Sequence, residues 1–359
     1  MKILLAAPGT GKTTRIKAIV DSEFKAARRI LILSFTNATV HDLTESFRDI
    51  PEVECHTLHS FALKINHLKD HYVLENKRER PALAKLAHDL NVDFRFICGL
   101  LRCITFDAMI AECLAFLRTN PAYGAEQIGV LDLLVVDEYQ DFNPTERSLV
   151  EQICCFAADT IFLGDDDQSI YGFKDADPDG IIELYNRAEI ERIENENKCH
   201  RCPDVVVEFA TKLITKNKHR IAKRWEKSGK PGNCVMKQFL GQAETNEFIV
   251  SEIEKIKNED PSTSFLVLTS VRYYVDELIA LLTDRNIGVV DFWASDIQDE
   301  DYFRVWWLRV IFSERKLLNL LFLAKELTPH YKRKLKIILA DALRHDFDEA
   351  TVLALIEPM

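Results

Sequence analysis

Short apolar runs alternate with helical patterns along the first half of the chain. Mainly apolar runs stand at positions 3–6, 30–35, 131–136 and 160–163, and each is followed by polar, acidic or small residues. A helical pattern follows the first run at residues 12–25. Strand, loop and helix in repeated succession are typical of a parallel sheet covered by helices on both faces. The pattern therefore predicts an α/β fold with ligand sites at the carboxyl ends of its strands.

The rest of the chain predicts further domains. Residues 63–129 are helical and charged without a strong strand pattern, and beyond residue 192 strands are predicted at 234–239, 265–269 and 289–292. We therefore predict a sheet domain made of residues 1–62 and 130–192, with a helical insertion at 63–129. A second, partial α/β domain is predicted at 193–292, followed by a helical tail at 293–359.

Composition predicts a soluble, cytoplasmic protein with no membrane contact. The chain has 359 residues, 47% of them hydrophobic, which is enough for a sizeable core. No apolar run approaches the ~20 residues that span a bilayer, and the N-terminus leads into a glycine-rich turn without a signal-peptide cleavage site. Nine scattered cysteines indicate reduced thiols. Cys199 and Cys202 have metal-ligand spacing, but no second pair follows, so we expect no zinc.

The formal net charge of −11 argues against nucleic-acid binding by bulk attraction, so any DNA contact is expected to be local. Two basic stretches are candidates for such a local DNA contact: residues 216–227 and residues 330–336. Trp225 lies among the cations of the first stretch. Each is equally typical of a solvated helix face.

The first chemical motif reads Ala-Ala-Pro-Gly-Thr-Gly-Lys-Thr at residues 6–13. Its glycines let backbone N–H groups point at phosphate oxygens, and the start of the next helix favours negative charge. Lys12 is predicted to reach the β- and γ-phosphates and Thr13 to ligate Mg²⁺. A chance Gly-Lys-Thr turn is disfavoured because the motif follows a strand and opens a helix. The nucleotide-binding residues predicted here are Pro8, Gly9, Thr10, Gly11, Lys12, Thr13 and Thr14.

A buried strand ending in two carboxylates is the natural companion of this motif. Residues 133–138 read Leu-Leu-Val-Val-Asp-Glu. Asp137 is predicted to hold the Mg²⁺, and Glu138 to orient and deprotonate the attacking water. Taken alone, an Asp-Glu pair would indicate surface charge, but downstream of such a turn it predicts a nucleotide hydrolase that uses ATP and Mg²⁺.

Four further segments carry a resemblance to a known family. Asp-Glu-Tyr-Gln-Asp at 137–141 resembles the second motif of the UvrD/Rep/PcrA-type superfamily 1 DNA helicases, and residues 164–173 resemble their third motif. Ser-Phe-Thr-Asn at 34–37 resembles motif Ia, and Thr-Leu-His-Ser-Phe at 57–61 resembles motif Ib. The likeness covers roughly residues 1–290 and implies that both α/β domains are RecA-like P-loop NTPase folds.

The resemblance also implies residue roles. Gln168 would sense the γ-phosphate, and Gln140 would link the nucleotide site to the DNA track. Phe173 would stack on a base of single-stranded DNA, and the alternative is an aromatic side chain of the hydrophobic core. For His59, the alternative to a DNA contact is a buried histidine. The residues implied to contact DNA are Phe35, Thr36, Asn37, Thr57, His59, Tyr171 and Phe173.

The fourth family motif is altered. Residues 199–202 read Cys-His-Arg-Cys where the family typically has Asn-Tyr-Arg-Ser. Arg201 keeps the cation expected at the γ-phosphate, and His200 replaces an adenine-stacking tyrosine. The predicted catalytic residues are thus Lys12, Glu138, Gln168 and Arg201, with Asp137 and His200 in the nucleotide site.

Three family motifs are not found: the glutamine motif that precedes the P-loop, and motifs V and VI. We therefore expect the sequence to stop inside the second helical insertion. An arginine finger such as that of motif VI is worth ~10³–10⁵ in rate, so turnover is expected to be weak unless a protein partner completes the second domain.

Two functional hypotheses remain side by side. The first is an ATP-driven helicase or translocase that moves 3′ to 5′ on single-stranded DNA. The second is a non-unwinding ATP-binding switch or regulatory subunit in a DNA repair or defence assembly. A nucleoside kinase is disfavoured because residues 164–173 have no place in one.

Overall fold

The computed structural model describes residues 1–24, 29–65, 71–74, 79–91, 93–269, 273–290, 337–338 and 351–352. Met1–Gly232 belong to one compact unit and Asn233–Phe303 to a second. The predicted tail at 293–359 and the basic stretch at 330–336 lie outside the described residues, apart from the two short pieces. Among the described helices, none has both the length and the apolar character that crossing a bilayer requires.

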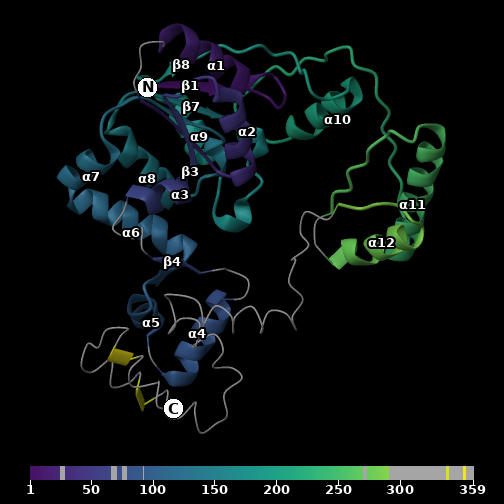
Figure 1. Cartoon of the computed structure of the whole chain (residues 1–359). Coiled ribbons are helices and arrows are strands. Elements are labelled where there is room, and N and C mark those ends of the chain that lie inside the picture. The colour runs from purple at the N-terminus through teal and green to yellow at the C-terminus, as the bar shows by residue number, and fades with distance from the viewer. Residues whose placement is uncertain are drawn as a thin grey trace. The chain divides into compact units, whose positions relative to one another are not determined.

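A six-stranded parallel sheet forms the centre of the first unit, in the order β3-β2-β6-β7-β1-β8 (Figure 1). Its strands are β1 (Lys2–Leu5), β2 (Ile30–Ser34), β3 (Val53–Thr57), β6 (Leu131–Val136), β7 (Ala157–Gly164) and β8 (Glu191–Arg192). The predicted α/β fold is therefore confirmed. The four inner strands are those predicted from apolar runs, whereas edge strands β3 and β8 were missed.

The ten helices described in the first unit are α1 (Lys12–Glu23), α2 (Asn37–Phe47), α3 (Leu58–Ile65), α4 (Glu79–Leu90), α5 (Phe94–Leu100), α6 (Phe106–Thr119), α7 (Pro121–Ile128), α8 (Pro144–Cys154), α9 (Asp179–Asn186) and α10 (Asp204–Ile214). Several begin at side-chain caps. Thr36 Oγ1 accepts from the amide of Thr39 at the start of α2, and Asn143 and Glu146 form a reciprocal capping box at α8.

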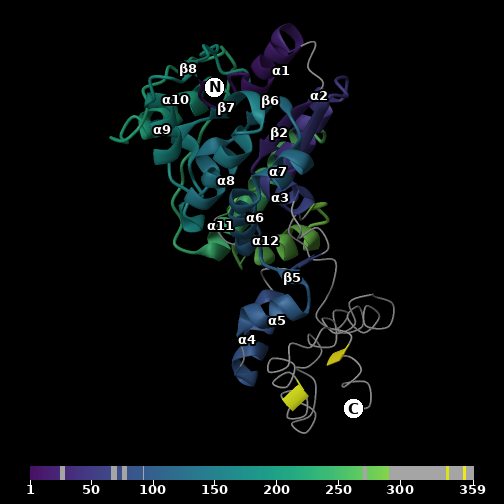
Figure 2. The ribbon, with the colours of Figure 1, turned by 90° about the vertical axis from the view of Figure 1, so that its left-hand side faces the viewer.

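Helices cover both faces of the sheet, as the run-and-helix pattern predicts. Along β6, Leu133 and Val135 pack with α1 and α2, whereas Leu134 and Val136 pack with α3, α6, α8 and α9. Figure 2 shows α1 and α2 on one side of β2 and β6, with α8 and α9 on the other. Burial on both faces explains why the buried parts of the inner strands are mainly apolar.

The region between α3 and β6 is helical, as expected, and contains α4 to α7. It also contains a two-stranded parallel sheet of β4 (Tyr72–Val73) and β5 (Cys103–Ile104), which the sequence pattern did not predict. Strands of two residues are too short to give an alternating pattern.

In the second unit, α11 (Gln242–Glu259) packs on α12 (Tyr273–Asp284) through Val250, Ile253, Leu278 and Leu282. The predicted strands were wrong for the described residues: 234–239, 265–269 and 289–290 form none. Met236 and Leu266, for example, remain largely exposed. Apolar, β-branched sequence forms a strand only where another strand pairs with it. The assignment of 193–292 to a second RecA-like domain stays a prediction.

Candidate nucleotide site and neighbouring groove

The glycine-rich turn between β1 and α1 depends on its glycines. Gly9 and Gly11 have φ values of +69° and +84°, in the left-handed region that favours glycine. A Cβ at Gly9 would lie 2.8 Å from Cβ of Arg201, so the turn and the segment carrying Arg201 approach as closely as backbone allows. The hydroxyl of buried Thr10 donates to the carbonyl of Ala7 at 2.7 Å and holds the turn closed.

Lys12 and Thr13 begin α1 at the end of this turn. Lys12 Nζ donates to the carbonyl oxygen of Ala6 at 3.1 Å, so its ammonium group lies over the turn. The free N–H groups of the first helical turn add partial positive charge at the same place. This arrangement fits a polyphosphate, which would compete with Ala6 for the ammonium group.

Asp137 follows β6 at the same edge of the sheet. It is 6% exposed, and burial, followed by the charge of Glu138, raises the pKa of its carboxyl group to about 7, although Lys12 acts in the opposite direction. A divalent cation would relieve this cost. The hydroxyl of Thr13 and the carboxylate of Asp137 are oxygen ligands of the kind Mg²⁺ prefers, so these residues fit the ion.

Glu138 connects to the third motif through a chain of hydrogen bonds. Gln140 Nε2 donates to Glu138 Oε2 at 2.9 Å, and its Oε1 accepts from the amide of Asp165 at 3.0 Å. Gln168 Nε2 then donates to Asp165 Oδ2 at 2.8 Å. Glu138 itself has φ 51° and ψ 46°, a strained conformation for a non-glycine residue. The carboxylate is therefore held in place from both the backbone and the side chain.

Residues 195–201 run directly over the glycine-rich turn. The amide of His200 donates to the carbonyl of Gly9 at 2.8 Å, and Asn195 Nδ2 donates to the carbonyl of Thr10 at 3.0 Å. His200 Nε2 lies 3.1 Å from Glu196 Oε2. These contacts place His200 and Arg201 at the rim of the same cavity as Lys12.

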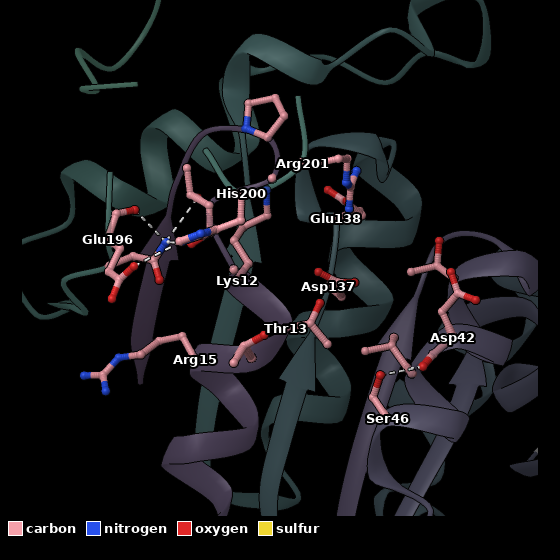
Figure 3. Close-up of a pocket in the computed structure, with 18 of the residues that line it drawn as sticks. Lys12, Thr13, Arg15, Asp42, Ser46, Asp137, Glu138, Glu196, His200 and Arg201 are labelled. Carbon is pink, nitrogen blue, oxygen red and sulfur yellow. Dashed lines mark hydrogen bonds and ion pairs between the residues drawn. The ribbon is translucent and has the colours of Figure 1, made fainter. Parts of the chain in front are cut away.

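The resulting cavity has a volume of about 1230 Å³, and every nucleotide-site and catalytic residue predicted from the sequence lines it. Figure 3 shows Lys12, Thr13 and Asp137 around the cavity, with Glu138 and Arg201 above them in this view. The residues' individual roles stay predictions. Sequence reasoning missed nine further lining residues, which belong to no motif: Arg15, Ala18, Thr39, Asp42, Leu43, Ser46, Glu194, Asn195 and Glu196.

A second cavity of about 970 Å³, here called the aromatic groove, contains all seven residues predicted to contact DNA. The rings of Phe35 and Tyr171 are 5.0 Å apart and those of Tyr171 and Phe173 5.8 Å apart, measured between centroids. Phe173 is 80% exposed, so the alternative of a core aromatic is wrong. Phe106, which the sequence analysis missed, adds a further ring 5.5 Å from His59.

The aromatic groove is unusual in its charges. Its lining includes three acidic residues, Asp107, Glu146 and Asp175, and none of its described lining residues is lysine or arginine. The first residues of four helices, α2, α3, α6 and α8, lie at or beside the groove. Helix N-termini offer partial positive charge and N–H donors in place of cationic side chains.

The basic stretch at 216–227 is exposed at Lys216, Lys218, Arg224 and Lys227, but the side chain of Lys223 is not. Lys223 is buried against Asp165, Asp166 and Asp167, and its side chain is 8% exposed. A local DNA contact through the exposed cations of this stretch stays a prediction, whereas the Lys223 ammonium group is already engaged by these carboxylates. Lys227 pairs with Glu208 at 2.8 Å.

Comparisons with known proteins agree with this geometry. Residues 1–174 match the model of a family described as an AAA domain. The chain is 22% identical over 321 residues to the ATP-dependent DNA helicase PcrA of Leuconostoc citreum, covering 71% of this chain and 42% of the relative. It is 30% identical over 192 residues to the ATP-dependent DNA helicase Rep of Buchnera aphidicola subsp. Acyrthosiphon pisum, covering 51% and 29%.

DNA helicase II of Rickettsia typhi is 24% identical over 334 residues, covering 72% of this chain and 49% of the relative. The chain thus aligns with less than half the length of each of these relatives.

Proposed function

We propose that this chain, which is UvrD/Rep/PcrA-like and has a P-loop NTPase fold, is an ATP hydrolase that couples turnover to 3′-to-5′ movement on single-stranded DNA. The observation that carries the proposal is the position of one short segment between two cavities. Gln168 lines the nucleotide cavity, and Tyr171 and Phe173 line the aromatic groove. A change at the γ-phosphate therefore has a route of a few residues to a stacked base.

In the proposed hydrolysis, the protein supplies position and charge more than covalent chemistry. The amides of the glycine-rich turn and Lys12 bind the phosphates. Glu138 accepts the proton of the attacking water and is oriented for this by Gln140. Arg201 neutralises charge that develops on the γ-phosphate.

Thr13 and Asp137 would hold Mg²⁺, which supplies charge neutralisation between the phosphates. The buried carboxyl group of Asp137 must be ionised to do this, and its raised pKa makes ionisation costly without a cation. We infer that nucleotide and metal bind together, since each supplies charge that the other requires.

In the aromatic groove, we propose that bases stack on the exposed face of Phe173 and its neighbours, while helix N-termini contact the backbone phosphates. Each stacked base contributes about 1–3 kcal/mol. Because no described lining residue is lysine or arginine, few counterions would be released, and binding in this groove should depend only weakly on salt.

The proposal is tested by ATP hydrolysis measured with and without single-stranded DNA. Lys12→Ala is expected to abolish nucleotide binding, whereas Glu138→Gln should retain binding and lose turnover, because it removes only the proton acceptor. Lys2→Ala is the matched control, since Lys2 pairs with Glu23 at the surface. Turnover unaffected by DNA, or retained in both variants, would contradict the proposal; ATP binding without turnover would favour a switch.

A further inference from the structure

Three consecutive aspartates follow β7 in a buried position. Asp165 is 0% and Asp166 6% exposed, and the side chain of Asp167 is 3% exposed. Oxygen atoms from the three carboxylates lie within 4.8 Å of one another. Like charges this close and this poorly hydrated are strongly unfavourable unless a cation compensates them.

Lys223 supplies that cation from a distant part of the sequence. Its Nζ lies 2.9 Å from Asp165 Oδ1 and 2.9 Å from Asp167 Oδ2, and it also contacts Asp166. Arg220 adds a bidentate pair with Asp167, at 2.8 and 2.6 Å. The ammonium group of Lys223 thus occupies the position that a metal ion would need in order to contact all three carboxylates.

The charges support this description of the cluster. Burial alone would lower the pKa of Lys223, but the charge of Asp165 and hydrogen bonds to the three carboxylates raise it above the usual lysine value. Burial would likewise raise the pKa of Asp167, yet Arg220 and Lys223 hold it below the usual range. Lys223 and Asp167 are therefore ionised together at neutral pH.

The carboxylate of Asp165 connects this cluster to Gln168, which lines the nucleotide cavity. Asp165 Oδ1 contacts Lys223, and Asp165 Oδ2 accepts from Gln168 Nε2 at 2.8 Å. Lys223 and the amide of Asp167, which donates to the same oxygen at 3.2 Å, thus hold one side of the Asp165 carboxylate, and its other oxygen holds the Gln168 amide. Lys223 lies in the same compact unit as His200, whose backbone rests on Gly9.

We propose that Lys223 is a positioning residue for γ-phosphate recognition: it acts as a built-in cation that orients Gln168 through Asp165. The inference rests on the proposed ATPase function and extends it to a residue in none of the motifs. Removing Lys223 should leave the phosphate-binding turn intact and impair only what depends on the γ-phosphate.

The test uses a charge-compensated double variant, because Lys223→Met alone leaves buried carboxylates uncompensated and is expected to destabilise the fold. Lys223→Met with Asp167→Asn removes one cation and one carboxylate, which keeps the net charge of the cluster. Asp167→Asn alone is one control. Lys212→Met is the other, since Lys212 forms an exposed pair with Glu208 at 2.8 Å.

Affinities for Mg·ATP and Mg·ADP are measured by calorimetry, together with kcat and KM. We expect the double variant to bind ADP within about twofold of wild type and to lose about tenfold in its preference for ATP, the size of one hydrogen bond to a charged group. The kcat should fall by at least about tenfold with little change in KM. Adding Gln168→Ala should cause no further loss, because both changes act through one contact.

A folded double variant that keeps the wild-type preference for ATP over ADP and the wild-type kcat would overturn the inference. Losses in ATP preference and kcat that add fully to those caused by Gln168→Ala would overturn it as well. If wild-type protein itself neither binds nor hydrolyses ATP, the proposed function fails and this inference fails with it. The wild-type measurement therefore separates the two failures.

Discussion

Replacing Asp137 by asparagine is expected to stabilise the nucleotide-free protein, and to do so more at pH 8 than at pH 5.5. In the folded chain, burial raises the pKa of this carboxyl group from 3.8 to about 7. In the unfolded chain the group regains its usual pKa and is ionised at both pH values. The folded state therefore binds the extra proton, and its stability from this group falls as pH rises through this window.

The magnitude follows from the same values. Above pH 7 the folded carboxylate costs about 4 kcal/mol relative to the unfolded one. Between pH 7 and 5.5 about 2 kcal/mol of this cost is relieved by protonation. Asparagine removes the titration, so its stabilising effect should be about 2 kcal/mol larger at pH 8. For a unit of this size that corresponds to roughly 4–8 °C in Tm.

The assay is thermal unfolding of wild type, Asp137→Asn and Asp21→Asn at the two pH values, without nucleotide or Mg²⁺. Asp21 is an exposed residue of α1 and controls for loss of one surface charge. Equal stabilisation by Asp137→Asn at both pH values would refute the reasoning, since it would show a carboxyl group that is ionised throughout. In the presence of Mg·ATP the order should reverse, because only the wild type keeps the metal ligand.

Two further substitutions test the two cavities separately. Gly9→Ala should weaken Mg·ATP binding at least about tenfold, because the methyl group would lie 2.8 Å from Cβ of Arg201 at a positive φ. Gly99→Ala, with open space around its Cβ, is the control. Equal Mg·ATP affinity of Gly9→Ala and wild type in calorimetry would contradict this prediction. Phe173→Ala should weaken single-stranded DNA binding about tenfold to hundredfold in fluorescence anisotropy while leaving ATP affinity unchanged. Ile170→Ala, exposed in the same loop but outside the groove, should have little effect; similar losses in both variants would argue against stacking on Phe173.

The sequence predicts the inner sheet and the motif residues of both cavities, for a physical reason. Strands buried on both faces are mainly apolar, so β2 and β6 stand out as runs. Phosphate and metal chemistry likewise restrict residue types at fixed positions after such strands, so Lys12 and Asp137 are recognisable without coordinates.

Edge strands and tertiary ion pairs lack such signals. β8 is two exposed residues, and its pairing with β1 depends on the fold around it. The Lys223 cation is separated by more than fifty residues from the carboxylates it contacts, so its basic neighbours suggest a surface patch. Phe106 enters the aromatic groove only because α6 begins there.

The central claim is that one Mg·triphosphate lies between the lysine of the glycine-rich turn and the carboxylate that ends β6. A crystal structure of the protein with Mg²⁺ and a non-hydrolysable ATP analogue tests it most directly. The account predicts that Lys12 Nζ leaves the carbonyl of Ala6 and lies about 3 Å from a γ-phosphate oxygen, with Thr13 and Asp137 around the metal. A nucleotide bound elsewhere, with Lys12 still on Ala6, would contradict it.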